Sequence, residues 1–337
     1  MHDELIAVRD LRVSFASDAG IAHVLDGVAL SIRAGEIRGL VGESGCGKTT
    51  LARAILGILP RGSARVASGE IRFQGIDLLT LPEDKLATDI RGRRIAYIPQ
   101  DPSTAFNPVF TIGTQILDLL RFKSPLLGHK GLGARARRQQ DRERVQKYLR
   151  LVQLPNPETV LEKYPHEVSG GQRQRLMIAM ALLTEPRLVI ADEPTTALDV
   201  TVQAQILKLL KELARDQGVA VLFTTHDLGA AYEICDRITV MYAGQEVEEA
   251  PVEGFFRRPS HPYTSKLLES LPSASATIRG IPGEIPRLID PPAGCRFHPR
   301  CERASEACRT ARPGPSSVDA AHSVRCHHPL HAAEPVA

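Results

Sequence analysis

The most constraining stretch of this 337-residue chain is Gly42-Glu43-Ser44-Gly45-Cys46-Gly47-Lys48-Thr49. It follows a short apolar run, residues 37–41, and leads into residues 50–56, which have the spacing of an amphipathic helix. A strand, a glycine-rich turn and a helix N-terminus in this order are the setting of a phosphate-binding loop. Glycine adopts backbone angles that let successive N–H groups face one anion, and the helix N-terminus adds further donors. The stretch therefore predicts a site for a nucleoside triphosphate.

Two side chains of this loop have a predicted role in binding the triphosphate. Lys48 supplies a positive charge for the β- and γ-phosphates, and the hydroxyl of Thr49 can ligate Mg²⁺. Thr50 continues the helix directly behind them. We expect ATP with Mg²⁺ at this loop.

Polar residues follow two other apolar runs. Residues 188–191 and 219–223 are continuous and apolar, as expected of buried parallel strands. Asp192 and Glu193 follow the first run, and Thr224-Thr225-His226 follows the second. Ligands of a doubly wound parallel sheet bind beyond the carboxyl ends of its strands, so these groups should converge on the same nucleotide. Asp192 suits Mg²⁺, Glu193 can activate a water, and His226 can donate a hydrogen bond to the γ-phosphate.

Three further features are candidates for the same site. Ser169-Gly170-Gly171-Gln172 has the composition of a second anion-binding turn that opens a helix. Gln100 directly follows a predicted strand at residues 94–98. Phe15 lies at the end of a predicted strand at 5–15, where it either stacks on an adenine ring or faces the core. Further strands are predicted at 24–32, 69–75 and 238–242.

Composition excludes several classes of protein. The net charge is only +3, tryptophan is absent and aromatic residues make up 4% of the chain, which argues against a nucleic-acid partner or a base-stacking platform. The apolar runs are far shorter than the roughly 18 residues of a membrane-spanning helix. The polar, acidic start is unlike a signal peptide, so we expect a cytoplasmic chain with reduced cysteines.

Residues 121–150 contain ten Lys or Arg against two acidic residues. Such a basic run is usually a solvated helix face or loop. The alternative is contact with phosphates of lipid or nucleic acid.

The order of these motifs resembles that of the ATPase subunits of ATP-binding cassette (ABC) transporters over residues 1 to about 250. The resemblance rests on residues 42–49, Gln100, 168–172, 188–193, 197–199 and His226. Further stretches resemble the dipeptide/oligopeptide importer branch, namely 100–108, 164–167, 192–200, 261–264 and 295–301. Val168 stands where this family usually has leucine, and Ala105-Phe106 where the branch usually has Ser-Leu. Neither departure removes a phosphate donor.

The resemblance implies an α/β fold: a P-loop NTPase cassette with a RecA-like core, an antiparallel β subdomain and an inserted helical subdomain at about 101–180. The cassette would span residues 1–250, and a short Cys-rich C-terminal extension would span 251–337. ATP would be bound by Phe15, residues 42–50, Ser169 to Gln172 and Asp199. Mg²⁺ would be bound by Thr49, Gln100 and Asp192, while Glu193, His226 and Gln100 would act in hydrolysis.

The resemblance also implies partners. Two cassettes would enclose two ATP molecules head to tail, with each phosphate-binding loop facing the Ser169 turn of the partner. The resemblance favours a paralogue as the partner cassette. Two membrane permease subunits and an extracytoplasmic substrate-binding protein would complete an importer of di- or oligopeptides at the cytoplasmic face of the membrane. Nickel, glutathione or an opine is the alternative cargo.

The sequence opposes two other functions. A non-transport cassette that acts on DNA or ribosomes is opposed by the lack of heptad arms and of a second phosphate-binding loop. A regulator that binds ATP without hydrolysing it is opposed by Glu193 and His226.

Four cysteines, Cys295, Cys301, Cys308 and Cys326, lie in a proline-rich segment with little means of building its own apolar core. A metal or cluster would supply the missing cross-links. Zinc is one possibility, because His298, His322, His327 and His328 lie close in sequence. Zinc sites favour pairs two to four residues apart, whereas irregular spacing suits a [4Fe–4S] cluster. The resemblance also favours the cluster, in a structural role.

Overall fold

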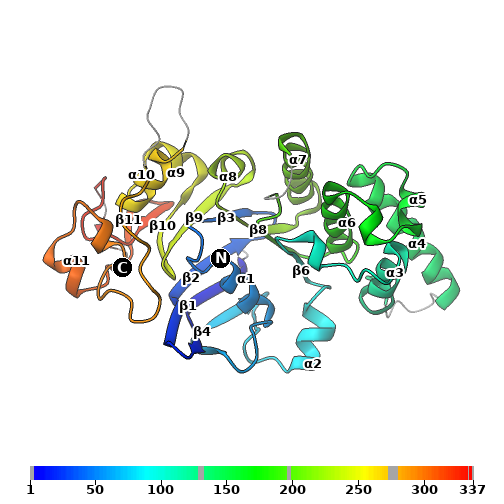
Figure 1. Cartoon of the computed structure of the whole chain (residues 1–337), viewed down its shortest axis with the longest axis horizontal. Helices are drawn as coiled ribbons and strands as arrows, with labels where there is room; N and C mark the ends of the chain where they lie inside the picture. Colours follow the sequence, from blue (N-terminus) through cyan, green and yellow to red (C-terminus); the bar gives the residue numbers. More distant parts are fainter. Residues whose placement is uncertain (1–3, 128–132, 196–198, 272–279, 333, 336–337) are drawn as a thin grey trace. The chain divides into compact units, whose positions relative to one another are not determined.

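The computed structural model describes residues 4–127, 133–195, 199–271, 280–332 and 334–335 (Figure 1). The chain forms two compact units. Unit 1 consists of residues 1–79 and 223–337, and unit 2 of residues 80–222. The division falls within strand β8 (Ala220–Thr225). The domain boundaries predicted at about 101–180 and at 250 do not coincide with this division and stay predictions.

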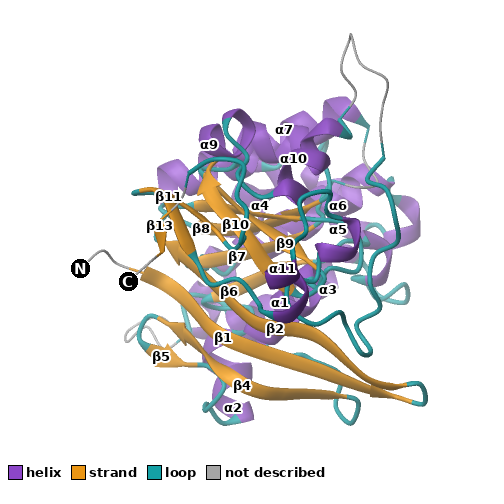
Figure 2. Cartoon of the chain, turned by 90° about the vertical axis from the view of Figure 1, so that its left-hand side faces the viewer, coloured by secondary structure: helices purple, strands orange, loops and turns teal. Residues whose placement is uncertain are grey.

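Unit 1 contains a four-stranded antiparallel sheet in the order β2-β1-β4-β5. Its strands are β1 (Glu4–Ser17), β2 (Gly20–Arg33), β4 (Ala64–Phe73) and β5 (Ile76–Asp77). Figure 2 shows the long strands β1, β2 and β4 side by side. Buried apolar side chains, including Ile6, Leu11 and Ile71, stabilise the sheet. The strands predicted at 5–15 and 24–32 are confirmed, while β4 begins five residues before the predicted 69.

A second sheet of unit 1 has the order β13-β11-β12-β10-β9-β3. Its strands are β3 (Ile37–Val41), β9 (Arg237–Tyr242), β10 (Gln245–Pro251), β11 (Ser316–Asp319), β12 (His322–Val324) and β13 (Glu334–Pro335). β3 runs parallel to β9 and is buried along its whole length, as its continuous apolar sequence predicts. The other pairs are antiparallel.

Among the described residues of unit 1, five α-helices accompany the sheets. They are α1 (Lys48–Leu56), α8 (Leu228–Ile234), α9 (Val252–Arg257), α10 (Pro262–Glu269) and α11 (Glu306–Thr310).

The C-terminal segment, residues 251–337, is more firmly packed than its sequence suggests. Phe255, Tyr263 and Phe297 are fully buried. The rings of Tyr263 and Phe297 lie 4.6 Å and 5.1 Å from that of Tyr242 on β9, measured between ring centroids. In addition, β12 pairs with β10. The segment thus needs no apolar core of its own, because its aromatic residues join the core of unit 1.

Unit 2 contains the parallel pair β6 (Ile95–Ile98) and β7 (Leu188–Asp192). Its helices are α2 (Glu83–Lys85), α3 (Ile112–Lys123), α4 (Ala134–Leu151), α5 (Pro157–Glu162), α6 (Gly170–Leu182) and α7 (Val200–Gln217). α7 buries one apolar face, including Ile206, Leu210 and Leu213, as its period predicts.

The basic run at 121–150 falls on the end of α3 and on α4, apart from residues 128–132, which lie outside the described chain. α4 buries Val145, Tyr148 and Leu149, while Arg138 and Arg142 are exposed. The described part of this run is thus mainly a solvated helix face. Among the helices of the described residues, none has the length and apolar character needed to cross a membrane.

Candidate functional site

The loop formed by residues 42–49 joins β3 to α1 in unit 1. Gly42 and Gly47 have φ values of 151° and 109°, a region that side chains with a Cβ rarely adopt. A Cβ at Gly42 would lie 2.2 Å from the carbonyl oxygen of Met241. Gly47 directly precedes the first residue of α1, Lys48. The tight glycine turn in front of a helix N-terminus is therefore confirmed.

Lys48 is held by the loop itself. Its side chain is buried, and its Nζ donates to the carbonyl oxygens of Gly42 at 2.8 Å and Glu43 at 3.4 Å. Thr49 and Thr50 are half-buried in the first turn of α1, while Ser44 and Gly45 are exposed. The positive charge predicted to bind phosphates is thus fixed at the base of the loop.

Cys46 is the one thiol within the loop. It is 1% exposed, and burial raises the pKa of its thiol. At neutral pH the side chain is protonated and packs as a small apolar group, so it is no nucleophile.

Glu43 is contacted by two residues of the C-terminal segment. Its backbone N–H donates to the hydroxyl oxygen of Tyr263 at 2.9 Å. Its carboxylate accepts from both terminal nitrogens of Arg300, at 2.8 Å and 3.2 Å. Residues 261–264 and 295–301 carry a family resemblance in the sequence, but their pattern predicts no contact with the loop. No local signal could have revealed these contacts, because they join residues 220 and 257 positions apart.

Within unit 2, the ends of β6 and β7 bring three polar side chains together. Asp192 is the last residue of β7, is 1% exposed, and accepts a hydrogen bond from the hydroxyl of Tyr97 at 2.9 Å. Glu193 follows it with a φ of 48°, unusual for a residue with a side chain. Its carboxylate accepts from the amide of Gln100 at 3.0 Å. The structure therefore brings Gln100 and Glu193 into direct contact, and it adds Tyr97, which the sequence motifs do not predict, as a neighbour of Asp192.

The Ser169 turn opens a helix, as predicted. Ser169 is the N-cap of α6: its hydroxyl accepts from the N–H of Gln172 at 3.3 Å, and its own N–H donates to the Gln172 side chain at 3.0 Å. This reciprocal capping box satisfies two helix N–H groups. Ser169 and Gly170 are exposed, and a Cβ at Gly170 would meet nothing within 4 Å.

The remaining predicted site residues occupy separate positions. Asp199 caps α7 and accepts from the N–H of Val202 at 2.9 Å. His226 is exposed and directly follows β8. Phe15 is half-buried on β1, opposite Ala22 of β2 and Ala64 of β4. Ala197 and Leu198 lie outside the described residues.

Comparison with known proteins identifies the family. The ABC transporter family model matches residues 25–196, and the model of the oligopeptide/dipeptide transporter C-terminal region matches residues 247–308. The chain is 45% identical to the probable peptide ABC transporter ATP-binding protein y4tR of Sinorhizobium fredii, over 96% of this chain and 95% of that one. It is 43% identical to the dipeptide transport ATP-binding protein DppD of Bacillus subtilis, over 96% and 94% of the two chains. This chain belongs to the ATP-binding proteins of ABC transporters.

A solved structure of the family agrees with the fold. The dimeric ATP-binding cassette MJ0796 bound to ADP and phosphate matches with a TM-score of 0.63 and 28% identity, covering 73% of this chain and 98% of that one. The cassette fold with its α/β sheets, predicted from the motifs, is confirmed.

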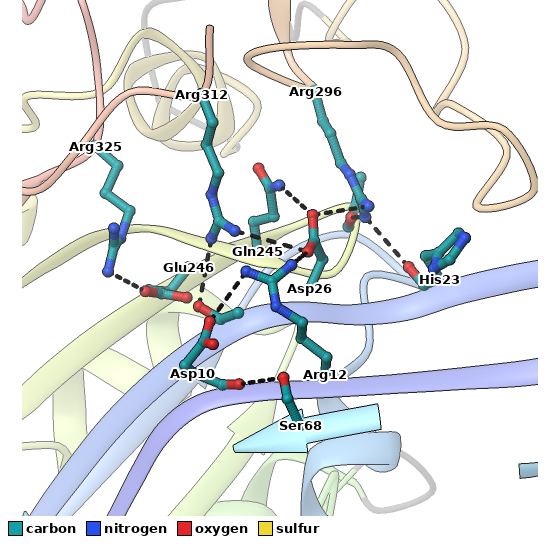
Figure 3. A network of polar contacts seen from close by, with 12 residues as sticks. Asp10, Arg12, His23, Asp26, Ser68, Gln245, Glu246, Arg296, Arg312 and Arg325 are labelled. Atoms are coloured by element: carbon teal, nitrogen blue, oxygen red, sulfur yellow. Dashed lines mark hydrogen bonds and ion pairs between the residues drawn. The ribbon is translucent and has the colours of Figure 1, made fainter. Parts of the chain in front are cut away.

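In this ABC protein the C-terminal segment is also anchored to β2 and β10, through Asp26 (Figure 3). The Asp26 carboxylate accepts from Gln245 at 2.8 Å and from Arg296 at 3.1 Å, and it also pairs with Arg12 and Arg312. Burial alone would raise the pKa of Asp26, but the Gln245 hydrogen bond and the three arginine charges lower it below its usual value. The carboxylate is therefore ionised and links the segment to the β strands at neutral pH.

The four C-terminal cysteines all lie in unit 1. Cys308 is buried and the other three are half-buried. Burial raises the pKa of Cys326 to about 12, and the charges of Cys295, Cys301 and Cys308 contribute to that rise. Among the described residues, no three His, Cys, Asp or Glu side chains are grouped so as to hold a metal ion.

The four candidate histidines for a zinc site each have another partner. His298 contacts the carbonyl oxygen of Cys295, His322 contacts Glu248, His327 contacts the carbonyl oxygen of Ala311, and His328 contacts Ser305, at 2.7–2.9 Å. The structure thus gives no support to histidine ligation by these residues.

Proposed function

We propose that this chain is the ATP-hydrolysing subunit of an importer of dipeptides or oligopeptides. The observation that carries the proposal is the 43–45% identity to two peptide-transport ATP-binding proteins along 96% of the chain. The match of residues 247–308 to the oligopeptide/dipeptide transporter C-terminal region supports the same branch. The cargo follows from these relatives, whereas ATP hydrolysis follows from membership of the family.

The proposed roles begin with nucleotide binding. Lys48 and the N–H groups of the glycine loop bind the β- and γ-phosphates. Thr49, Gln100 and Asp192 offer the hydroxyl, amide and carboxylate oxygens that Mg²⁺ prefers, and the Asp192 carboxylate is already oriented by Tyr97. When bound, Mg²⁺ supplies positive charge to the phosphates.

For hydrolysis, Glu193 is proposed to take a proton from the attacking water. Its left-handed backbone supports this role, because strained conformations of non-glycine residues cluster at functional sites. Gln100 orients the Glu193 carboxylate through the 3.0 Å hydrogen bond. His226 is proposed to donate a hydrogen bond to the γ-phosphate, and Asp199 to support the nucleotide site from the start of α7.

A second cassette, favoured to be a paralogue, is proposed to complete each ATP site with its own Ser169 turn. The capping box leaves Ser169 and Gly170 exposed at a helix N-terminus, which is a suitable site for an anion brought by another molecule. The proposed assembly includes two membrane permeases and an extracytoplasmic binding protein, with this chain bound to the permeases at the cytoplasmic face.

We also propose that Cys295, Cys301, Cys308 and Cys326 hold a structural [4Fe–4S] cluster. The backbone N–H of His328 donates to the Cys326 sulfur at 3.4 Å. The backbone groups of Phe297 and His298 oppose the rise of the Cys295 pKa, and that of Arg303 opposes the rise of the Cys301 pKa. Such donors stabilise sulfur ligands carrying negative charge. Burial raises the pKa of the Cys295, Cys301 and Cys326 thiols, and the charges of neighbouring cysteines contribute to each rise.

Reconstitution tests the proposal. The chain is co-expressed with its neighbouring permease and cassette subunits, purified as one complex and placed in lipid vesicles with the binding protein. Uptake of a labelled dipeptide should require ATP and should be abolished by Lys48→Ala in this chain. The proposed function would be contradicted if the chain did not co-purify with the permease subunits. Uptake of nickel or glutathione, but of no peptide, would contradict it as well.

A further inference from the structure

We propose that Tyr263 and Arg300 are positioning residues for the phosphate-binding loop. They hold Glu43 from the C-terminal segment, so ATP affinity depends on a part of the chain outside the nucleotide motifs. This inference deepens the proposed function and rests on ATP being bound at residues 42–49. Neither residue needs to touch the nucleotide, since both act through Glu43.

Tyr263 fixes the backbone of Glu43. The tyrosine is 0% exposed, and its ring packs against those of Tyr242 and Phe297. Its own backbone is fixed as well, because its N–H donates to Nδ1 of His261 at the start of α10. The hydroxyl that accepts the Glu43 N–H therefore has little freedom to move. One N–H of the loop is engaged here, and its direction sets that of the neighbouring peptide groups.

Arg300 fixes the side chain of Glu43. Its guanidinium binds both carboxylate oxygens, a two-point geometry that sets orientation as well as distance. The same group donates to the carbonyl oxygens of Pro282 at 2.9 Å and Ile281 at 3.2 Å, and to the hydroxyl of Tyr242 at 3.2 Å. Its side chain is 3% exposed. The donors of Arg300 are thus committed to one arrangement.

Two consequences reach the nucleotide-binding lysine. Glu43 and Gly42 provide the carbonyl oxygens that accept hydrogen bonds from the Lys48 ammonium. Fixing the position of Glu43 therefore fixes one of the two acceptors of Lys48. The Glu43 carboxylate also carries a negative charge within the loop that must accept a triphosphate. Arg300 neutralises this charge by pairing with both carboxylate oxygens. Without Arg300, a partly buried carboxylate would be unpaired, which is unfavourable both for the loop and for an incoming anion.

The test measures ATP affinity of the purified full-length chain and KM and kcat of the assembled complex. Arg300→Gln should weaken ATP binding about tenfold, which corresponds to about 1.4 kcal/mol, because the loop loses the contact that orients Glu43. KM should rise while kcat changes little, because the interaction aids binding rather than the chemical step. Tyr263→Phe, which keeps the ring, should give a smaller loss in the same direction. Arg300→Lys keeps the charge without the two-point geometry and should recover part of the affinity.

A matched control separates positioning from mere stabilisation. Arg312→Gln removes another arginine of the C-terminal segment, one that pairs with Asp26 and donates to the Gly27 carbonyl rather than contacting Glu43. It should lower the urea midpoint yet leave ATP affinity within about twofold. A double-mutant cycle adds a second check: in a Glu43→Gln background, Arg300→Gln should have little further effect on affinity.

The proposal is overturned by wild-type affinity in folded Arg300→Gln and Tyr263→Phe, by an equal loss in Arg312→Gln, or by additive effects in the cycle. If Arg300→Gln fails to fold, the isosteric Tyr263→Phe decides the matter by its ATP affinity. Absence of ATP binding by the wild-type chain would instead refute the proposed function. Peptide uptake is not involved in the binding measurement, so the two failures remain distinguishable.

Discussion

The two glycine-containing turns of this protein, residues 42–49 and 169–172, are held in opposite ways. The first is largely buried at its base and is bound by Tyr263 and Arg300, which follow it by more than two hundred residues. The second is exposed, and the hydrogen bonds that define it lie within the four residues themselves. Both end at the start of a helix, so both offer backbone N–H groups to an anion.

The difference indicates which turn depends on its own chain. The phosphate-binding loop contains charged groups, Lys48 and Glu43, that need fixed partners when they are withdrawn from water. The C-terminal segment and the loop backbone supply those partners. The Ser169 turn needs no distant contact, because its capping box satisfies the helix end locally. A self-contained, exposed turn suits contact with another molecule.

The largest expected effect concerns the hydrolytic step. Glu193→Gln keeps the size of the side chain and its ability to form a hydrogen bond with Gln100, but it removes the base. Turnover of the assembled complex should fall by about 10² or more while ATP remains bound. Lys48→Ala is the matched control, because it should weaken ATP binding itself. ATPase rates and nucleotide retention measure the two effects, and parental turnover in Glu193→Gln would remove Glu193 from its assigned role.

The four C-terminal cysteines allow a test of whether a cluster stabilises the C-terminal segment of unit 1. Anaerobically purified protein should be brown and contain about four iron and four sulfide per chain. Cys301→Ser should bleach it and increase proteolysis after residue 280, whereas the buried Cys235→Ala should keep the iron. Metal analysis and limited proteolysis provide the readout. Stoichiometric zinc without iron would refute the cluster, although a metal cross-link would remain.

A pH effect should arise at His261, which holds Tyr263 at the start of α10. Burial lowers the pKa of His261 to about 4, against 6.5 when unfolded. The unfolded chain therefore binds the proton more tightly, so the full stability is present above pH 6.5 and is lost as the pH falls towards 4. Between pH 7 and pH 5 this amounts to about 2 kcal/mol.

His261→Asn provides the control for that effect. Asparagine can also accept the N–H of Tyr263 as an N-cap, but it does not titrate. Urea denaturation at both pH values should show a smaller decrease in stability for the variant than for the parent. Equal decreases in the two proteins would show that His261 is not the group responsible.

Sequence reasoning succeeded where the determining contacts are local. The glycine turn before α1, the buried strands β3 and β7, and the capping box at Ser169 depend on residues a few positions apart. It failed where contacts cross long stretches of chain. The binding of Glu43 by Tyr263 and Arg300 and the pairing of β12 with β10 have no local signal, since a lone tyrosine or arginine in a proline-rich segment has no periodicity to read. The charge of Arg300 alone would suggest a solvated residue, yet its partners keep it buried.

The most direct test of the central claim, that the chain fixes its own phosphate-binding loop and provides the Ser169 turn to a partner cassette, is ATP binding by isolated Ser169→Arg. We predict the parental ATP affinity in the isolated chain, together with loss of ATP-driven pairing and hydrolysis in the assembled complex. Lys48→Ala, measured in parallel, should lose binding already in the isolated chain. Weakened binding by isolated Ser169→Arg, or normal pairing and hydrolysis in the complex that contains it, would contradict the account.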